Sequence, residues 1–235
     1  ARERLAVHLD DLPARYTSVV TPARAREHLE MIEELDARAA AVRFRRLRHV
    51  KEITVVARDR PFRLSQLCGA LTVNDLDIRG AWAFTRRDGV VIDRFHVTRL
   101  DGGVALGAAD RRRLEVDLAA ALDGELDLDR AVRRHVSRWR RRARGGIPVP
   151  TTVEFDNELS AGSTVVDVTA QDRPGLLYRI TRLFGEEGLD IRTALVATRG
   201  GTAADSFYVR AVGGGKLEDA AAMKRLRRRL ARALA

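Results

Sequence analysis

The feature that most constrains the fold of this chain is an internal duplication. Ile53 to Val97 can be laid over Val166 to Val209 with one deletion, and the register holds from one end to the other. The two segments share an Asp-Arg-Pro motif at 59–61 and 172–174, and a Leu-Asp-Ile motif at 76–78 and 189–191. The period exceeds a hundred residues, which is too long for a solenoid repeat and indicates a duplicated domain.

Each copy predicts the same succession of elements. The β-branched runs at 53–57 and 164–170 indicate a central strand, which the Asp-Arg-Pro motif ends. The fixed φ of proline suits the first helical position, so helices are predicted to begin at Pro61 and Pro174. Two strands joined by a Gly-containing turn follow, and then a second helix. These last elements are predicted at 78–85, 90–98 and 108–122 in the first copy, and at 191–198, 204–212 and 217–234 in the second.

A short strand around Val42 or Val153 supplies the fourth strand of each copy from its N-terminal side. Four strands and two helices predict an α+β fold of the ferredoxin-like βαββαβ type, with both helices on one face of an antiparallel sheet. The expected domains are a helical lead-in at 1–39, the first copy at 40–125, a basic linker helix at 126–150 and the second copy at 151–235. The lead-in has a capped amphipathic helix after Thr21-Pro22, and the missing initial Met hints that the chain begins inside a larger protein.

The net charge of +10 is concentrated in two stretches, 130–144 and 224–232, and the rest of the chain is slightly acidic. The arginines of the first stretch could grip phosphates, but there is no set of aromatic side chains to stack bases. Val132, Val136 and Trp139 form a helical stripe that can pack on protein while the arginines face water. This pattern favours a linker helix, facing an acidic domain or a nucleotide, over a nucleic-acid site. The phosphate-binding candidates are Arg133, Arg134, Arg138, Arg140, Arg141 and Arg142.

Cysteine and hydropathy exclude other classes of protein. Cys68 is the only cysteine, so an internal disulfide is impossible, and its place in an apolar helical stripe indicates a packing role. The sequence has neither a transmembrane run nor a signal peptide, and a cytoplasmic location is expected.

The stretch Asp-Arg-Pro-Gly-Leu-Leu-Tyr at 172–178, followed by Gly-Leu-Asp-Ile-Arg at 188–192, resembles the ACT domain pattern. A tandem pair, introduced by Val149-Pro150-Thr151-Thr152-Val153-Glu154-Phe155, is similar to the C-terminal regulatory end of the protein-PII uridylyltransferase/uridylyl-removing enzymes. The resemblance covers roughly residue 40 onwards. It implies amino-acid effectors bound between paired ACT modules, with glutamine favoured, and action on the PII signal protein through the intact enzyme. We expect glutamine to bind the second module. Trp82, which matches Leu195, is expected to pack in the core or where two modules meet edge to edge.

The chain also departs from that family. Phe62 stands where the second copy has Gly175, so the first loop is expected to approach a ligand less closely, and its site to be altered or lost. Neither the Gly-Ser turn with paired aspartates of a nucleotidyltransferase nor the His-Asp pair of a metal phosphohydrolase is present, the nearest match being Asp127-Leu128-Asp129. No catalytic residue and no cofactor is therefore expected in this chain, and Mg²⁺ is expected only in catalytic domains upstream.

An amino-acid sensor needs an anion site beside a cation site. Backbone N–H groups after Pro174 can hold a carboxylate, Gly175 allows close approach, and Asp172 together with Asp190 can accept the ammonium hydrogens. The alternative is that these aspartates only cap or end helices. The predicted ligand-binding residues are Asp172, Arg173, Pro174, Gly175, Leu176, Leu177, Asp190 and Ile191 in the second copy, and Asp59, Arg60, Pro61, Asp77 and Ile78 in the first.

Three functions remain open from the sequence. The first is a pair of ACT modules that senses glutamine and biases an attached enzyme between uridylylation and deuridylylation of PII. The second is a free-standing ACT-repeat protein that binds another amino acid, and the third is a nucleic-acid-associated regulator that uses the arginine helix.

Overall fold

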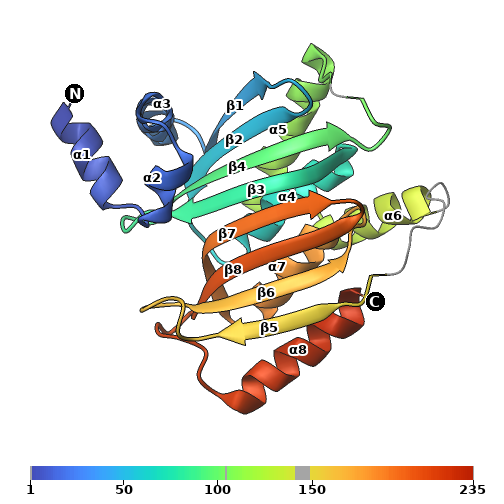
Figure 1. Ribbon diagram of the computed structural model, residues 1–235. Coiled ribbons are helices and arrows are strands. Elements are labelled where there is room, and N and C mark those ends of the chain that lie inside the picture. The colour runs from blue at the N-terminus through green and yellow to red at the C-terminus, as the bar shows by residue number, and fades with distance from the viewer. Residues whose placement is uncertain (1, 104, 141–148, 235) are drawn as a thin grey trace.

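The computed structural model, which describes residues 2–103, 105–140 and 149–234, has one continuous antiparallel sheet built from both copies (Figure 1). Its eight strands lie in the order β1-β2-β4-β3-β7-β8-β6-β5. The first copy supplies β1 (Ala40–Arg46), β2 (Lys51–Arg58), β3 (Leu76–Thr85) and β4 (Val90–Arg99). The second supplies β5 (Thr152–Asp156), β6 (Thr164–Gln171), β7 (Leu189–Arg199) and β8 (Thr202–Ala211).

The helices divide between the two faces of this sheet. One face carries α4 (Arg63–Val73), α5 (Ala108–Asp123), α7 (Leu176–Glu186) and α8 (Ala220–Leu234), with α6 (Leu128–Arg140) between the copies. The lead-in forms α1 (Arg2–Asp10), α2 (Arg15–Val19), α3 (Pro22–Glu33) and a 3₁₀ turn, Glu34–Asp36. The predicted α+β fold is confirmed as two βαββ units, each completed by a strand that precedes it in the chain.

The alternation of each strand divides the core into two layers. In the first copy Val55, Ala83 and Phe95 face α4 and pack with buried residues of the helices, while Val56 and Phe84 face the opposite side. That opposite side is covered by the lead-in helices, whose Tyr16 and Met31 are fully buried against it. The lead-in is therefore part of the folded first copy.

The two copies join edge to edge through β3 and β7. Gly80 to Phe84 pair antiparallel with Thr193 to Ala197, and Trp82 lies directly opposite Leu195. The expected meeting of the two modules at Trp82 is confirmed. Behind this ladder α4 and α7 pack against each other, so the copies also share a helix–helix contact. The pairing relates the copies by an approximate twofold axis at the centre of the sheet.

The starts of α4 and α7 differ from the prediction. Neither helix begins at Pro61 or Pro174; they begin two residues later, at Arg63 and Leu176. The intervening residues, Phe62 and Gly175, have φ values of 67° and 77°. A left-handed residue cannot continue a right-handed helix, so the prolines belong to the loop instead.

A buried hydrogen-bonded chain fastens the lead-in to the first copy. Arg86 Nη1 lies 2.7 Å from His8 Nδ1, His8 Nε2 lies 3.1 Å from the Tyr16 hydroxyl, and that hydroxyl lies 2.6 Å from His28 Nδ1. Arginine can only donate, so His8 Nδ1 accepts, its Nε2–H donates to Tyr16, and Tyr16 donates to His28. Burial lowers the pKa of both His8 and His28 to about 4, so the chain is built from neutral imidazoles.

We predict that acid loosens this attachment. The folded pKa of about 4 lies below the ordinary histidine pKa of 6.5, so the unfolded chain binds more protons between these values and stability falls as the pH drops from 6.5 towards 4. The wild-type chain should lose up to about 2 kcal/mol per histidine at pH 5, relative to the His8→Gln/His28→Gln double variant. Urea unfolding of both proteins at pH 7 and pH 5 measures this, and a stability difference independent of pH would contradict it.

Candidate ligand site between the two copies

Two cavities lie at opposite ends of the β3–β7 junction, and each is made by both copies. We call the one beside residues 59–62 the first-loop cavity and the one beside residues 172–175 the second-loop cavity. The predicted site residues fall into two sets. Asp59, Arg60, Pro61, Asp190 and Ile191 line the first-loop cavity. Asp77, Ile78, Asp172, Arg173, Gly175, Leu176 and Leu177 line the second-loop cavity. Pro174, also predicted as a ligand-binding residue, does not line either of these cavities.

This distribution corrects the expected pairing of Asp172 with Asp190. Those two aspartates line different cavities; Asp59 instead meets Asp190, and Asp77 meets Asp172. The reason is the antiparallel junction, which places the end of β2 and the start of β7 at one end of the sheet, and the end of β6 and the start of β3 at the other. Each loop therefore faces the first residues of the other copy's strand.

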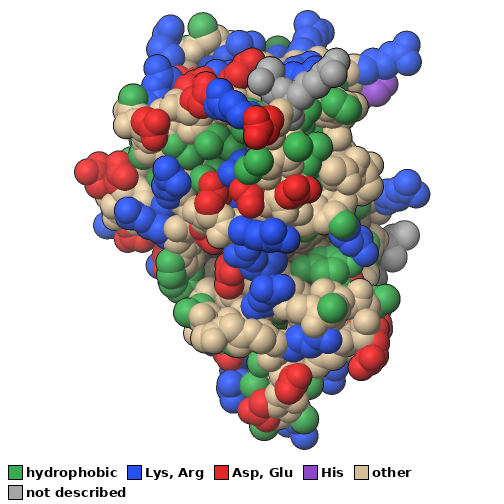
Figure 2. Space-filling model, turned by 90° about the vertical axis from the view of Figure 1, so that its left-hand side faces the viewer, with side chains coloured by type: hydrophobic (Ala, Val, Ile, Leu, Met, Phe, Trp, Pro, Cys, Tyr) green, Lys and Arg blue, Asp and Glu red, His purple; other side chains and the backbone are tan. Residues whose placement is uncertain are grey.

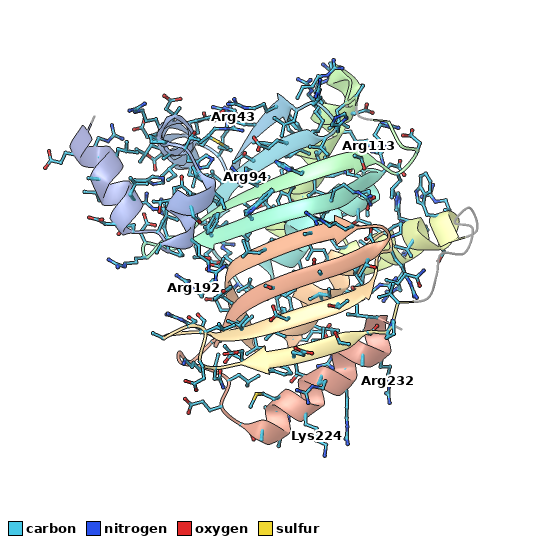
Figure 3. The ribbon with its side chains drawn as sticks, in the orientation of Figure 1. Arg43, Arg94, Arg113, Arg192, Lys224 and Arg232 are labelled. Carbon is cyan, nitrogen blue, oxygen red and sulfur yellow. The ribbon has the colours of Figure 1, made fainter. Side chains whose placement is uncertain are left out.

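In the first-loop cavity two carboxylates share one partly buried site. Burial and the charge of Asp190 raise the pKa of Asp59 to about 6, while Arg192 opposes the shift. Arg192 Nη1 lies 3.3 Å from Asp190 Oδ2, and its Nη2 donates to the Thr85 carbonyl at 3.4 Å. Among the described residues Asp59 has no ion-pair partner within 4 Å. Figure 3 labels Arg192 at this end of the sheet, and Figure 2 views the same end, where acidic and basic side chains lie close together.

In the second-loop cavity the corresponding carboxylates already hold a cation. Arg79 Nη1 lies 2.9 Å from Asp77 Oδ2 and 3.0 Å from Asp172 Oδ2, so one guanidinium nitrogen bridges the two copies. Burial and the charge of Asp77 raise the pKa of Asp172 to about 6, and Arg79 opposes the shift. The pair of aspartates is thus arranged to bind a nitrogen cation.

The two cavities differ greatly in size. The first-loop cavity has a volume of about 250 Å³. The second-loop cavity has about 20 Å³, which is room for about one water molecule. Helix α6 packs on the second loop, since a Cβ added at Gly175 would lie 3.1 Å from Val136 and 3.3 Å from Val132. The first residues of α6, Leu128 and Asp129, line a further cavity together with Pro61 and Phe62.

Phe62 forms part of the lining of the first-loop cavity. It adopts the same left-handed conformation as Gly175, with a φ of 67°, and its ring packs over Gly185 of the other copy, where any Cβ would collide with it. The side chain becomes one wall of a cavity that stays open. Phe62 is also 40% exposed, so this wall reaches the surface.

Sequence reasoning missed Asp93 and Asp205, which are 2% and 3% exposed and line the first-loop and second-loop cavities. The available signal was their place in the alternation, because each lies on the helix-covered face of its strand among apolar residues. An acid repeated on a buried face requires a partner.

The basic stretches take structural positions. In α6 Val132 and Val136 are buried, as the apolar stripe predicted, and Arg133, Arg134 and Arg138 are exposed. Arg141 and Arg142 lie outside the described residues. In α8 Leu226, Leu230 and Leu234 are buried, while the labelled Lys224 and Arg232 point away from the sheet (Figure 3). Within the described ranges no cluster of His, Cys, Asp and Glu could hold a metal, and no helix is long and apolar enough to cross a membrane.

Comparison with known proteins gives a consistent set of relatives. The model of the ACT domain matches residues 164–231. The bifunctional uridylyltransferase/uridylyl-removing enzyme of Azospirillum brasilense is 37% identical over 82% of this chain and 21% of its own length. The enzymes of the same name from Rhodospirillum rubrum and Phenylobacterium zucineum are each 34% identical, over 80% and 96% of this chain and 20% and 24% of theirs. The chain therefore spans about a fifth of the length of these relatives.

We predict that Arg79 holds down the proton affinity of Asp172. In the Arg79→Gln variant the pKa of Asp172 should rise further above its value of about 6, because the bridging cation that favours the carboxylate is removed. Because the folded pKa lies above the unfolded one, stability falls as the pH rises from about 4 through the folded pKa. In the variant this fall should extend to a higher pH. Carboxyl ¹³C NMR measures the titration directly. An unchanged Asp172 titration would contradict the bridge.

Proposed function

Since the chain carries an ACT domain and its homologues over most of its length are C-terminal regions of bifunctional uridylyltransferase/uridylyl-removing enzymes, we propose that it senses a free amino acid, glutamine above all, in the first-loop cavity. The observation that carries the proposal is the aspartate pair Asp59 and Asp190 facing an open cavity. Its counterpart, Asp77 and Asp172, holds the guanidinium of Arg79.

The cation half of the site follows from the approximate twofold axis. Arg79 Nη1 marks the place where a nitrogen cation sits between two such carboxylates. The equivalent place in the first-loop cavity lies between Asp59 and Asp190, where Arg192 neutralises only Asp190. A ligand ammonium there makes charge-assisted hydrogen bonds to both carboxylates. It also relieves the repulsion that raises the pKa of Asp59.

The anion half of the site is the start of α4. The first backbone N–H groups of a helix have no acceptor within it, and the helix dipole adds positive potential at this end. The left-handed Phe62 turns the chain so that this start faces the cavity, which Leu64 and Ser65 line. Arg60 lines the same cavity and adds a positive charge. A zwitterion thus meets opposite charges on the two sides of one small cavity.

The regulatory role rests on the relatives. Their name describes two opposed activities, addition and removal of a uridylyl group, and this region carries an ACT domain. We propose that glutamine bound here biases an attached catalytic part between those activities on the PII signal protein, in the cytoplasm. Such coupling requires that the ligand bind one arrangement of the two copies more tightly than another.

We predict a single glutamine site per 235-residue chain, seen by isothermal titration calorimetry against the twenty amino acids. The Asp59→Asn variant should weaken binding by roughly tenfold to a hundredfold, because it removes the charge that holds the ammonium. Asp172→Asn is the matched control. It makes the same change at the equivalent residue of the closed cavity and should leave the affinity unchanged.

Three outcomes would contradict this assignment. The absence of heat with every amino acid would remove the sensing function. Two sites per chain would show that the second-loop cavity opens in solution. A loss confined to Asp172→Asn would move the site to the second loop.

A further inference from the structure

Asp93 is a buried acid whose carboxyl oxygen lacks a partner. It lies in β4, directly opposite Val55 on one side and Ala83 on the other, on the helix-covered face of the sheet. The residue is 2% exposed and lines the first-loop cavity. Its Oδ2 is buried and makes no hydrogen bond among the described residues. A buried polar atom left in this state destabilises the fold, so its position in a cavity wall calls for a partner from the cavity.

The surroundings of Asp93 favour its protonated form. Burial raises the pKa of Asp93 well above its ordinary value, the charge of Asp59 raises it further, and Arg63 opposes the shift. Arg63 is itself engaged by the Arg58 and Leu122 carbonyls and by Gln66. A protonated carboxyl group offers one O–H donor and one carbonyl acceptor. A primary carboxamide offers the complementary acceptor and donor, so the two groups can form a paired hydrogen bond.

Asp93 also lies at a suitable distance from the charged end of the cavity. Asp59 donates its N–H to the Gly89 carbonyl at the hairpin, and Val91 and then Asp93 follow along β4 on the cavity side. Successive residues on one face of a strand are about 7 Å apart. Ala83, Val91 and Ile191 make the wall between the two ends apolar, which suits methylene groups. A ligand whose headgroup sits at Asp59 thus points its side chain towards Asp93.

The second copy contains a natural comparison. Asp205 occupies the equivalent place and is 3% exposed, and its Oδ1 accepts a hydrogen bond from the Ala197 N–H at 3.3 Å. The cavity beside it has about 20 Å³. The duplicated acid therefore has a backbone partner where the cavity is closed, and the acid beside the open cavity has an oxygen without one. A purely structural role for this residue type does not account for that difference.

We propose that Asp93 is the specificity-determining residue of the first-loop cavity, and that it selects a carboxamide side chain over a carboxylate or an alkyl side chain. The proposal rests on the function proposed above for the same cavity. A carboxylate side chain lacks a hydrogen to donate and places a third acid beside Asp93 and Asp59. An alkyl side chain leaves the acid without a partner.

The test compares the affinity of the 235-residue chain for glutamine, glutamate and norleucine by calorimetry in the wild type and three variants. Asp93→Leu should weaken glutamine by roughly tenfold to a hundredfold and bring it level with norleucine. Asp93→Asn keeps a donor and an acceptor but replaces the acid by an amide, whose N–H can donate a hydrogen bond to the side-chain carboxylate of glutamate. The preference for glutamine over glutamate should therefore fall. Asp205→Leu, the same change beside the closed cavity, should leave all three affinities unchanged.

The outcomes separate the two proposals. Two results would overturn the role of Asp93 and leave the sensing function intact, provided that the wild type binds glutamine. One is a folded Asp93→Leu variant whose ratio of glutamine affinity to norleucine affinity is unchanged. The other is an Asp93→Asn variant whose ratio of glutamine affinity to glutamate affinity is unchanged. Equal losses in Asp93→Leu and Asp205→Leu would also overturn it. A wild-type chain that binds no amino acid would remove both proposals together. Thermal unfolding monitored by circular dichroism shows whether each variant is folded. If Asp93→Leu does not fold, Asp93→Asn provides the test.

Discussion

The backbone ladder between β3 and β7 is the interaction on which the rest of the structure depends. It joins two four-stranded sheets into one, and because it is antiparallel it sets each Asp-Arg-Pro loop against the first residues of the other copy's strand. Neither copy alone contains a complete cavity. A ligand in the first-loop cavity contacts both copies, so its binding energy depends on how they are placed relative to each other.

Duplication supplies two equivalent sites, and a few substitutions make them unequal. Arg79 and Arg192 are equivalent arginines, but only Arg79 forms an ion pair with an aspartate of the other copy. Helix α6 follows the first copy and packs on the second loop at Gly175. The closed cavity then serves as internal support, since its carboxylates are neutralised without a ligand. In the open cavity Arg192 pairs with Asp190, and among the described residues Asp59 has no ion-pair partner.

Much of this could be predicted from the sequence, and the misses have physical causes. The duplication and the strands followed from periodicity, because burial on one face leaves a regular trace. The meeting of the copies at Trp82 followed from the resemblance to paired ACT modules. The starts of α4 and α7 lie two residues later than predicted, because Phe62 and Gly175 are left-handed; Phe62 gives no sign of that conformation, and Gly175 permits it without requiring it. The pairing of Asp59 with Asp190 depends on which strand edges meet, and no local pattern encodes that. Asp93 left a trace, an acid in a buried alternation, whose meaning needed the cavity beside it.

The path from the cavity to the rest of the chain runs through adjacent residues. Thr85 lines the first-loop cavity and receives a hydrogen bond from Arg192, and the next residue, Arg86, holds His8 and Asp11 of the lead-in. A ligand that changes the charge balance around Asp190 acts on Arg192 and so on the carbonyl of Thr85. The lead-in is attached at that point by neutral histidines and one arginine. Its apolar residues pack on the face of the sheet that lies opposite the α4 face. A ligand in this cavity and the attachment of the lead-in would thus both act on the segment at Thr85 and Arg86. Through that segment, ligand binding could favour one arrangement of the lead-in over another.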